Sequence, residues 1–294
     1  MMYRIRHVTE YQYNTPVTLC YNIAHVLPRD TPMQLCQATS IHVHPSPVYQ
    51  QKRTDYFGNH TYYFSLQEPH KKLVIDVTSE IKIESIRPSL DLDLGVTCGQ
   101  AREILRQSKD PEILENKEFM LDSPMIKSSA SLKAYAAELF TDNRPLLSAA
   151  RELTTKIFKE FKYDPASTTV ATPLHEVLEL KSGVCQDFAH LAIGCLRSMG
   201  FPARYVSGYL ETLPPPGKEK LVGSDATHAW FAIYSPGEGW FEFDPTNDNM
   251  PGEQHIVTAW GRDYSDVTPL RGVIFEGGGD QILSVSVDVQ RIGA

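Results

Sequence analysis

Three residues in the second half of the chain have the side-chain types that thiol-dependent acyl transfer needs. Cys185 offers a nucleophilic sulfur, His228 an imidazole that can take and return a proton, and Asp244 a carboxylate that can orient the imidazole. Each residue alone has a plainer explanation: a small core residue, an edge histidine, and a turn aspartate before proline. Together, and in this order, they favour a catalytic triad.

A helix is predicted to place the cysteine. Apolar residues at alternating intervals of three and four form a buried seam that starts at Cys185 and stops before Gly200 (Cys185, Phe188, Ala192, Cys195, Met199). The free N–H groups and the positive dipole end of a first helical turn favour a thiolate and can bind an oxyanion. Cys195, further along the same seam and away from the helix end, is expected to be a core residue.

Two strands joined by a turn are predicted to place the histidine and the aspartate. Residues 228–234 and 239–244 have strand composition, and Ser235-Pro236-Gly237-Glu238 between them is typical of a turn. Neighbouring strands joined this tightly should pair antiparallel.

The register of this hairpin decides whether the two side chains meet. If Ile233 faces Gly239, His228 faces Asp244, and their Cβ atoms are about 5 Å apart. A slip of one residue would put them on opposite faces. Trp230 shares the face of His228 and is expected to shield the pair from water.

Metal binding is a competing use of these side chains. Cys185, His190, His228 and Asp244 could supply zinc ligands in kind, but their spacing matches no standard zinc pattern. A further pair on one predicted strand has spacing that a metal could use, although a polar sheet face is the simpler explanation (His42, His44). We expect no metal and no cofactor.

The composition excludes several classes of protein. The chain has 294 residues with 41% hydrophobic residues and a net charge of −8, ordinary globular values that rule out wholesale disorder and argue against nucleic-acid binding. No run of about 18 apolar residues exists to span a membrane, and no secretory signal is visible. Five cysteines without a CxxC pair favour reduced thiols and a cytoplasmic location.

The chain divides into three predicted parts. Residues 1–86 alternate polar and apolar side chains between turn signals, which predicts a β-sandwich-like domain. Residues 87–130 have no strong period and are predicted to connect two domains. Residues 131–294 are predicted to form the catalytic domain, with a helix from about 145 to 161 and a short helix after Pro173.

Residues 158–248 resemble the transglutaminase-like core of the papain-like cysteine-enzyme superfamily. The segments that carry the resemblance are Phe161-Lys162-Tyr163, Thr172-Pro173-Leu174, Gly183-Val184-Cys185-Gln186-Asp187-Phe188-Ala189-His190, Gly200 to Tyr209, Thr227-His228-Ala229-Trp230 and Gly239 to Asn247. Residues 2–84 resemble the β-rich N-terminal domain of the bacterial members, through His7 to Tyr13, Leu27-Pro28-Arg29 and Asp55 to Asn59. The tail Gly261 to Gly272 is similar to the same group.

The resemblance implies an α+β fold, in which a β-sandwich-like domain precedes a papain-like/transglutaminase-like core. It also implies that Cys185 is the nucleophile, His228 the base and Asp244 the orienting acid. The bacterial group is described as cysteine proteases with poorly defined substrates. Animal transglutaminases hold an upstream Trp near the oxyanion, and papain-like proteases hold a Gln a few residues before the Cys. Here no Trp precedes Cys185 and the stretch from Leu178 to Ser182 contains no Gln, so Tyr163 is the candidate for this role. Nothing resembles the calcium sites of the animal enzymes.

Several further residues are candidates for the substrate cleft. Gln186 and Asp187 directly follow the nucleophile, although Asp187 could simply favour the helix dipole. Arg204 is expected to be a buried partner of Asp187. Tyr209 belongs to a strand face that could line the cleft or form a core edge.

The favoured function is cleavage or transfer of acyl groups from peptide or protein amides through a thioester on Cys185, by a hydrolase or a transferase. One alternative is acetyl transfer from a thioester donor, as in arylamine acetyltransferases, which lack the N-terminal β domain. Another is a non-catalytic peptide-binding scaffold with a relict triad. The expected partner is a peptide or protein substrate, without nucleic acid or membrane.

Overall fold

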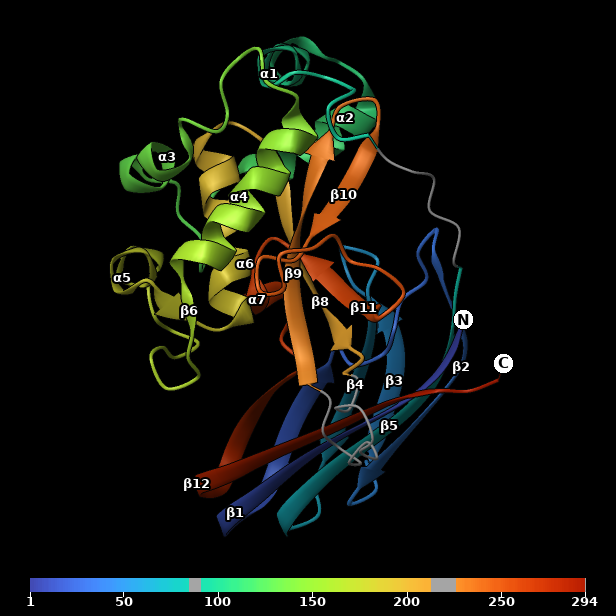
Figure 1. The fold of residues 1–294 in the computed structure, drawn as a ribbon. Helices are drawn as coiled ribbons and strands as arrows, with labels where there is room; N and C mark the ends of the chain where they lie inside the picture. The colour runs from blue at the N-terminus through green and yellow to red at the C-terminus, as the bar shows by residue number, and fades with distance from the viewer. Residues whose placement is uncertain (85–90, 213–225, 294) are drawn as a thin grey trace, which may run out of the picture.

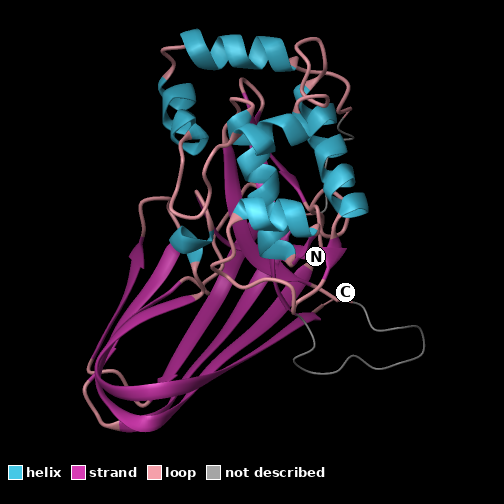
Figure 2. Ribbon diagram, turned by 90° about the vertical axis from the view of Figure 1, so that its left-hand side faces the viewer, coloured by secondary structure: helices cyan, strands magenta, loops and turns pink. Residues whose placement is uncertain are grey.

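Long strands form one end of the molecule and helices the other (Figures 1 and 2). The computed structural model describes residues 1–84, 91–212 and 226–293. In chain order the elements are β1 Met2–Ala24, β2 Gln34–His44, β3 Tyr49–Thr54, β4 His60–Leu66, β5 His70–Ile83, α1 Cys98–Gln107, α2 Pro111–Asn116, the 3-10 helix η1 Lys117–Met120, α3 Ala130–Ala136, α4 Leu146–Glu160, β6 Lys162–Tyr163, α5 Leu174–Leu180, β7 Ser182–Gly183, α6 Cys185–Ser198, β8 Ala203–Leu210, β9 Ala226–Ser235, β10 Gly239–Phe243, β11 His255–Gly261, α7 Tyr264–Val267 and β12 Leu270–Arg291.

The β-rich end is a six-stranded sheet that folds back on itself. Its strand order is β2-β5-β1-β4-β3, and β12 pairs with the other side of β1. The first part of β1 pairs with β5 and the last part with β4, with register shifts between Tyr13 and Leu19 where the strand bends. Buried side chains of both halves pack together, among them Val17, Phe64 and Ile75. This arrangement confirms the expected sandwich-like character and the α+β fold.

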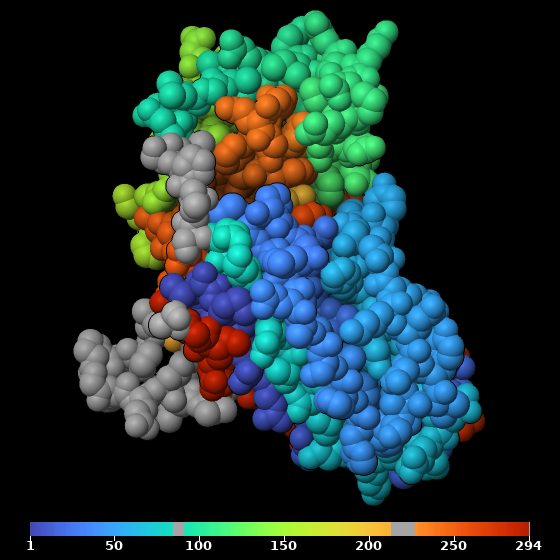
Figure 3. All heavy atoms as spheres, turned by 90° about the vertical axis from the view of Figure 1, so that its right-hand side faces the viewer, coloured from blue at the N-terminus to red at the C-terminus, as the bar shows by residue number. Residues whose placement is uncertain are grey.

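The last strand of the chain lies in the first sheet. β12 pairs with β1 from Leu270, opposite Ala24, to Arg291, opposite Tyr3. Figure 3 shows this red strand against the dark blue start of the chain, and the two termini lie close together in Figures 1 and 2. The predicted domain of residues 131–294 therefore needs a correction, because residues 270–291 belong to the β-rich unit. Pairing between such distant segments leaves no local signal in a sequence.

The predicted connection over residues 87–130 also needs a correction. Cys98, Ala101 and Leu105 of α1 lie in the same buried core as the helices that follow, together with Ile126. Thr97 caps α1 by accepting the N–H of Gln100. This segment is thus a structural part of the helix-rich unit.

The helix-rich end is built around an antiparallel sheet of order β10-β9-β8-β11. The central helix α6 packs on β9 and β8, and Cys195 is fully buried in this core, as predicted. α4 confirms the helix expected over residues 145–161, with Pro145 as its cap residue. In the described residues, none of the helices has the length and apolar character needed to cross a membrane.

Candidate active site

Cys185 is the first residue of α6. The carboxylate of Asp187 accepts the backbone N–H of Val184 at 2.8 Å and the hydroxyl of Thr168 at 2.6 Å, so it caps the helix and ties a neighbouring loop to its start. A Cβ at Gly183 would lie 2.6 Å from an Asp187 oxygen, which explains the glycine at this position. The local sequence therefore fixes where the helix begins and so where the thiol lies.

Cys185 differs from the other thiols of α6 and α1 in its exposure. All five cysteines are free, and Cys185 is partly exposed, whereas Cys98 and Cys195 are fully buried. Burial raises the pKa of Cys98 to about 11 and that of Cys195 to about 12, so these two remain neutral thiols. A reagent or substrate in water can reach Cys185 but not these two.

The predicted hairpin register is wrong by two residues. Ser235, and not Ile233, faces Gly239, because the turn between β9 and β10 is shorter than expected and contains Gly237 with a φ of 84°. A shift of two keeps every side chain on its predicted face. Asp244, just beyond β10, therefore lies diagonally across from His228 on the same side of the sheet.

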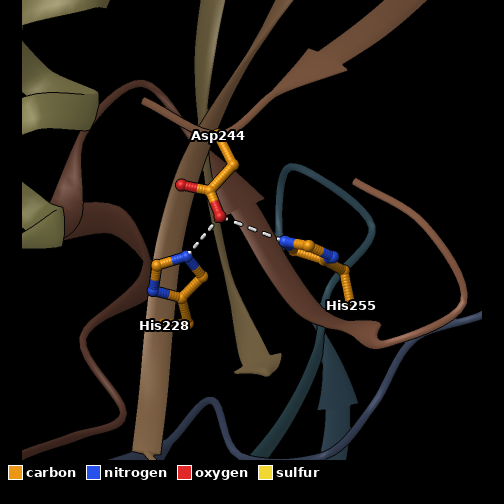
Figure 4. Close-up of side chains that lie close together, drawn as sticks. All are labelled: His228, Asp244 and His255. Carbon is orange, nitrogen blue, oxygen red and sulfur yellow. Dashed lines mark hydrogen bonds and ion pairs between the residues drawn. The ribbon is translucent and has the colours of Figure 1, made fainter. Parts of the chain in front are cut away.

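His228 and Asp244 are hydrogen-bonded despite this shift. His228 Nε2 lies 2.7 Å from Asp244 Oδ2 (Figure 4), and Cys185 lies close enough to His228 to help raise the pKa of the imidazole through hydrogen bonding and charge. Because Nε2 is used by the carboxylate, Nδ1 is the nitrogen left for the sulfur. The three residues singled out from the sequence are thus brought together as a continuous chain.

Burial and charge act in opposite directions on this pair. His228 is 7% exposed and Asp244 is fully buried. Burial lowers the pKa of His228, but hydrogen bonds and charges of Asp244 and Cys185 outweigh it and raise this pKa to about 9. Burial likewise raises the pKa of Asp244, but hydrogen bonds from His228 and His255 hold it well below its usual range. The arrangement favours an imidazolium held by a carboxylate.

The sequence analysis missed the other partners of Asp244. Asn247 Nδ2 donates to Oδ2 at 2.7 Å, and the backbone N–H groups of Thr246 and Asn247 donate to Oδ1 at 2.8 and 3.3 Å. His255 Nε2 also lies 3.1 Å from Oδ2. Asn247 could have been found from its closeness to Asp244 in the chain. His255 could not, because it reaches the site from β11, which pairs with β8 and not with the hairpin.

Three residues of the site could also be considered as metal ligands. In the described part of the chain, only His228, Asp244 and His255 have ligand atoms close enough together to hold a metal ion. Their donor chemistry fits hydrogen bonding instead. His255 Nδ1 accepts the N–H of Gly252, so its Nε2 carries a proton and has no free lone pair for a metal. Among the other histidines weighed as ligands, His190 is buried and accepts the N–H of Tyr264.

Three of the residues predicted for the substrate cleft lie near Cys185 or His228. Tyr163, 53% exposed on β6, pairs through its backbone with Gly183, and burial together with the charge of Cys185 raises its pKa. Gln186 donates to the carbonyl of Val170 at 3.4 Å. Trp230 is fully buried with its ring centroid 5.9 Å from that of His228, in the shielding position expected for it.

Two other candidates have different partners from those expected. Arg204 does not pair with Asp187; its guanidinium lies between the rings of Trp240 and Trp260, at 4.2 and 3.7 Å. Tyr209 is 2% exposed and donates or accepts a 2.8 Å hydrogen bond with His7 Nδ1, so it belongs to the core between the two sheets and not to an open cleft.

Comparisons with known proteins agree with the fold. Residues 3–82 match the family described as the bacterial transglutaminase-like N-terminal region, and residues 133–245 match the transglutaminase-like superfamily. The uncharacterized protein Rv2569c of Mycobacterium tuberculosis is 40% identical over 98% of this chain and 92% of its own. A protein-glutamine gamma-glutamyltransferase of Pseudomonas aeruginosa is 29% identical over 48% of this chain and 23% of its own.

One solved structure shares the whole fold. The crystal structure described as a "putative cysteine protease" from Cytophaga hutchinsonii superposes with a TM-score of 0.77, covering 100% of this chain and 91% of that chain at 22% sequence identity. It shows that the β-rich and helix-rich units occur together in another bacterial protein.

Proposed function

Because the chain belongs to the transglutaminase-like superfamily, we propose that it is a cysteine-dependent acyl-transfer enzyme acting on peptide or protein amides. The observation that carries the proposal is the 2.7 Å hydrogen bond between Asp244 and His228 beside Cys185, the first residue of α6. A partly exposed thiol, a buried imidazole and a buried carboxylate in this order have the roles of nucleophile, acid–base group and orienting group.

The reaction follows from these roles. The Cys185 sulfur attacks the amide carbonyl carbon, and the resulting tetrahedral oxyanion collapses to a thioester. The amine leaves with the proton that His228 donates. Water or a second amine then attacks the thioester while His228 removes its proton, so the acyl group is released as an acid or a new amide. The thiol and imidazole are regenerated, and Asp244 keeps its charge throughout.

We propose two groups as the partners of the oxyanion. The first-turn N–H groups of α6 point out of the helix start that carries Cys185. The Tyr163 hydroxyl is the second candidate. The Tyr163 ring contacts Phe188 of α6, and the charge of Cys185 contributes to the raised pKa of Tyr163. We propose this tyrosine in the place that a tryptophan or glutamine takes in related enzymes.

An assay with a glutamine-containing peptide tests the proposal and separates its two branches. The purified chain is incubated with the peptide, with and without a primary amine, and the products are followed by mass spectrometry. Ammonia release or chain cleavage without amine supports a hydrolase, and amine incorporation supports a transferase. Cys185→Ala should abolish either reaction, whereas Cys195→Ala, a thiol of the same helix, should keep it. Activity that survives in Cys185→Ala would contradict the proposal.

A further inference from the structure

We infer that His255 is a positioning residue that holds Asp244 in the orientation His228 needs; this inference rests on the proposed function. His255 is the first residue of β11 and is buried, and its Nε2 lies 3.1 Å from the same Asp244 oxygen that binds His228 (Figure 4). Its side chain is 5% exposed, and none of the described contacts joins it to the thiol. Its action on the reaction therefore passes through the carboxylate.

The hydrogen bonds of His255 fix its tautomer. The backbone N–H of Gly252 donates to His255 Nδ1 at 3.2 Å, so Nδ1 is an acceptor and the ring proton is on Nε2. His255 is then a neutral donor to Asp244. With His228 and Asn247 it brings three donors to Oδ2, while two backbone N–H groups bind Oδ1. The carboxylate cannot turn without breaking several of these bonds.

Packing holds the imidazole of His255 in place. Its ring centroid lies 5.3 Å from that of Trp230 in an edge-to-face contact and 6.0 Å from that of His228. Trp230 in turn donates its indole N–H to Glu242 at 2.8 Å. The two histidines therefore lie on either side of one carboxylate, against one fixed indole.

The β-rich unit fixes the strand that carries His255. Gln34 donates to the Val257 carbonyl at 2.8 Å and accepts the Val257 N–H at 2.9 Å. Asn59 makes the same pair of bonds with Trp260, at 2.8 and 2.9 Å. These two amides take the place of a neighbouring strand along the free edge of β11. Hydrogen bonds thus connect the N-terminal unit to β11, and His255 of β11 connects this strand to the Asp244 carboxylate.

The test is the rate at which iodoacetamide alkylates Cys185, followed by peptide mass spectrometry from pH 5 to 9 in the full chain. His255→Leu should slow alkylation about tenfold near pH 6 and move the acid limb of the profile to higher pH, because a carboxylate that turns away supports the imidazolium less. His255→Gln keeps an N–H donor and an acceptor, so it should stay within about threefold of wild type.

A second buried histidine gives the matched control. His70 lies in β5 against Tyr13 and the Glu68 carbonyl, away from the site, so His70→Leu should lower stability yet leave the alkylation profile unchanged. A wild-type profile in His255→Leu, or equal slowing in the Leu and Gln variants, overturns the inference. His228→Ala separates the two claims: if it too leaves the profile unchanged, the proposed function fails as well.

Discussion

Asp244 is the residue on which the site depends at the smallest scale. It is fully buried, yet its two oxygens receive five N–H groups, two from histidines, one from an asparagine side chain and two from the backbone. A buried carboxylate with so many donors stays ionised. Its role is to orient and stabilise the imidazolium and not to carry a proton.

Replacing this carboxylate by an amide tests that role. Asp244→Asn keeps one acceptor oxygen for His228, so we expect a loss of one to two decades in the rate of Cys185 alkylation near pH 6, or about 1.4–3 kcal/mol. Asp244→Ala should cost more, because nothing then holds the ring. Asp263 is the matched control, because it is a second fully buried carboxylate. It accepts the backbone N–H groups of Met125 and of Ser265 in α7, and Asp263→Asn should leave the rate unchanged. Coincident profiles for all variants would remove Asp244 from the triad.

The raised pKa of His228 also predicts how stability changes with pH. The imidazole pKa is about 9 in the folded chain and about 6.5 when unfolded, so the protonated ring stabilises the fold fully below pH 6.5. This contribution, on the order of 3 kcal/mol, is lost as the pH rises from 6.5 through 9. Urea unfolding at pH 6 and pH 9 should show a smaller decrease for His228→Gln than for wild type. Equal decreases would contradict the raised pKa.

At the scale of single elements, the start of α6 is set by Asp187 and not by the cysteine itself. Asp187→Ala removes the acceptor of the Val184 N–H and the link to Thr168. We expect a loss of about 1 kcal/mol in the free energy of unfolding, together with a several-fold slower alkylation of Cys185. Thr97→Ala removes the side chain that accepts the N–H of Gln100 at the start of α1, and it should cost similar stability without changing the alkylation rate. If both variants alter the rate alike, the cap has no specific role at the site.

The sequence predicted those features of the elements that depend on residue patterns over short stretches of the chain. The α6 helix, its start at Cys185 and the shared face of His228 and Asp244 all follow from residue spacing over short stretches. The exact facing pair of the hairpin did not, because the turn length depends on positive-φ glycines that the sequence leaves open. His255 was missed since no local pattern indicates that β11 lies beside Asp244.

At the scale of the whole molecule, the β-rich unit contributes to the active site without supplying a catalytic group. β12 returns to pair with β1, and the amides of Gln34 and Asn59 bind the free edge of β11. The sequence indicated two domains, but it could not show that the chain passes from the first to the second and back. Both units should therefore unfold together.

Removing the pair of hydrogen bonds between the Gln34 side chain and the Val257 backbone tests this coupling between the units. Gln34→Leu leaves the N–H and carbonyl of Val257 unpaired in a buried place, which should cost about 2–4 kcal/mol of stability. It should also slow alkylation of Cys185, because β11 and His255 are held less firmly. Gln12→Leu makes the same substitution at an exposed position of β1 and should change neither quantity. An unchanged alkylation rate in a folded Gln34→Leu variant would show that these hydrogen bonds stabilise the fold but do not affect the active site.

The most direct test of the central claim is selective labelling of the folded chain with a substoichiometric electrophile at pH 6, read out by peptide mass spectrometry. We expect the label on Cys185 ahead of the four other thiols, because it alone combines partial exposure with closeness to His228, whose pKa it helps to raise. His228→Ala should slow this labelling strongly, and Cys195→Ala should leave it unchanged. Equal labelling of Cys185 and Cys36, the other partly exposed thiol, or a rate that does not depend on His228, would contradict the existence of a working Cys–His–Asp triad.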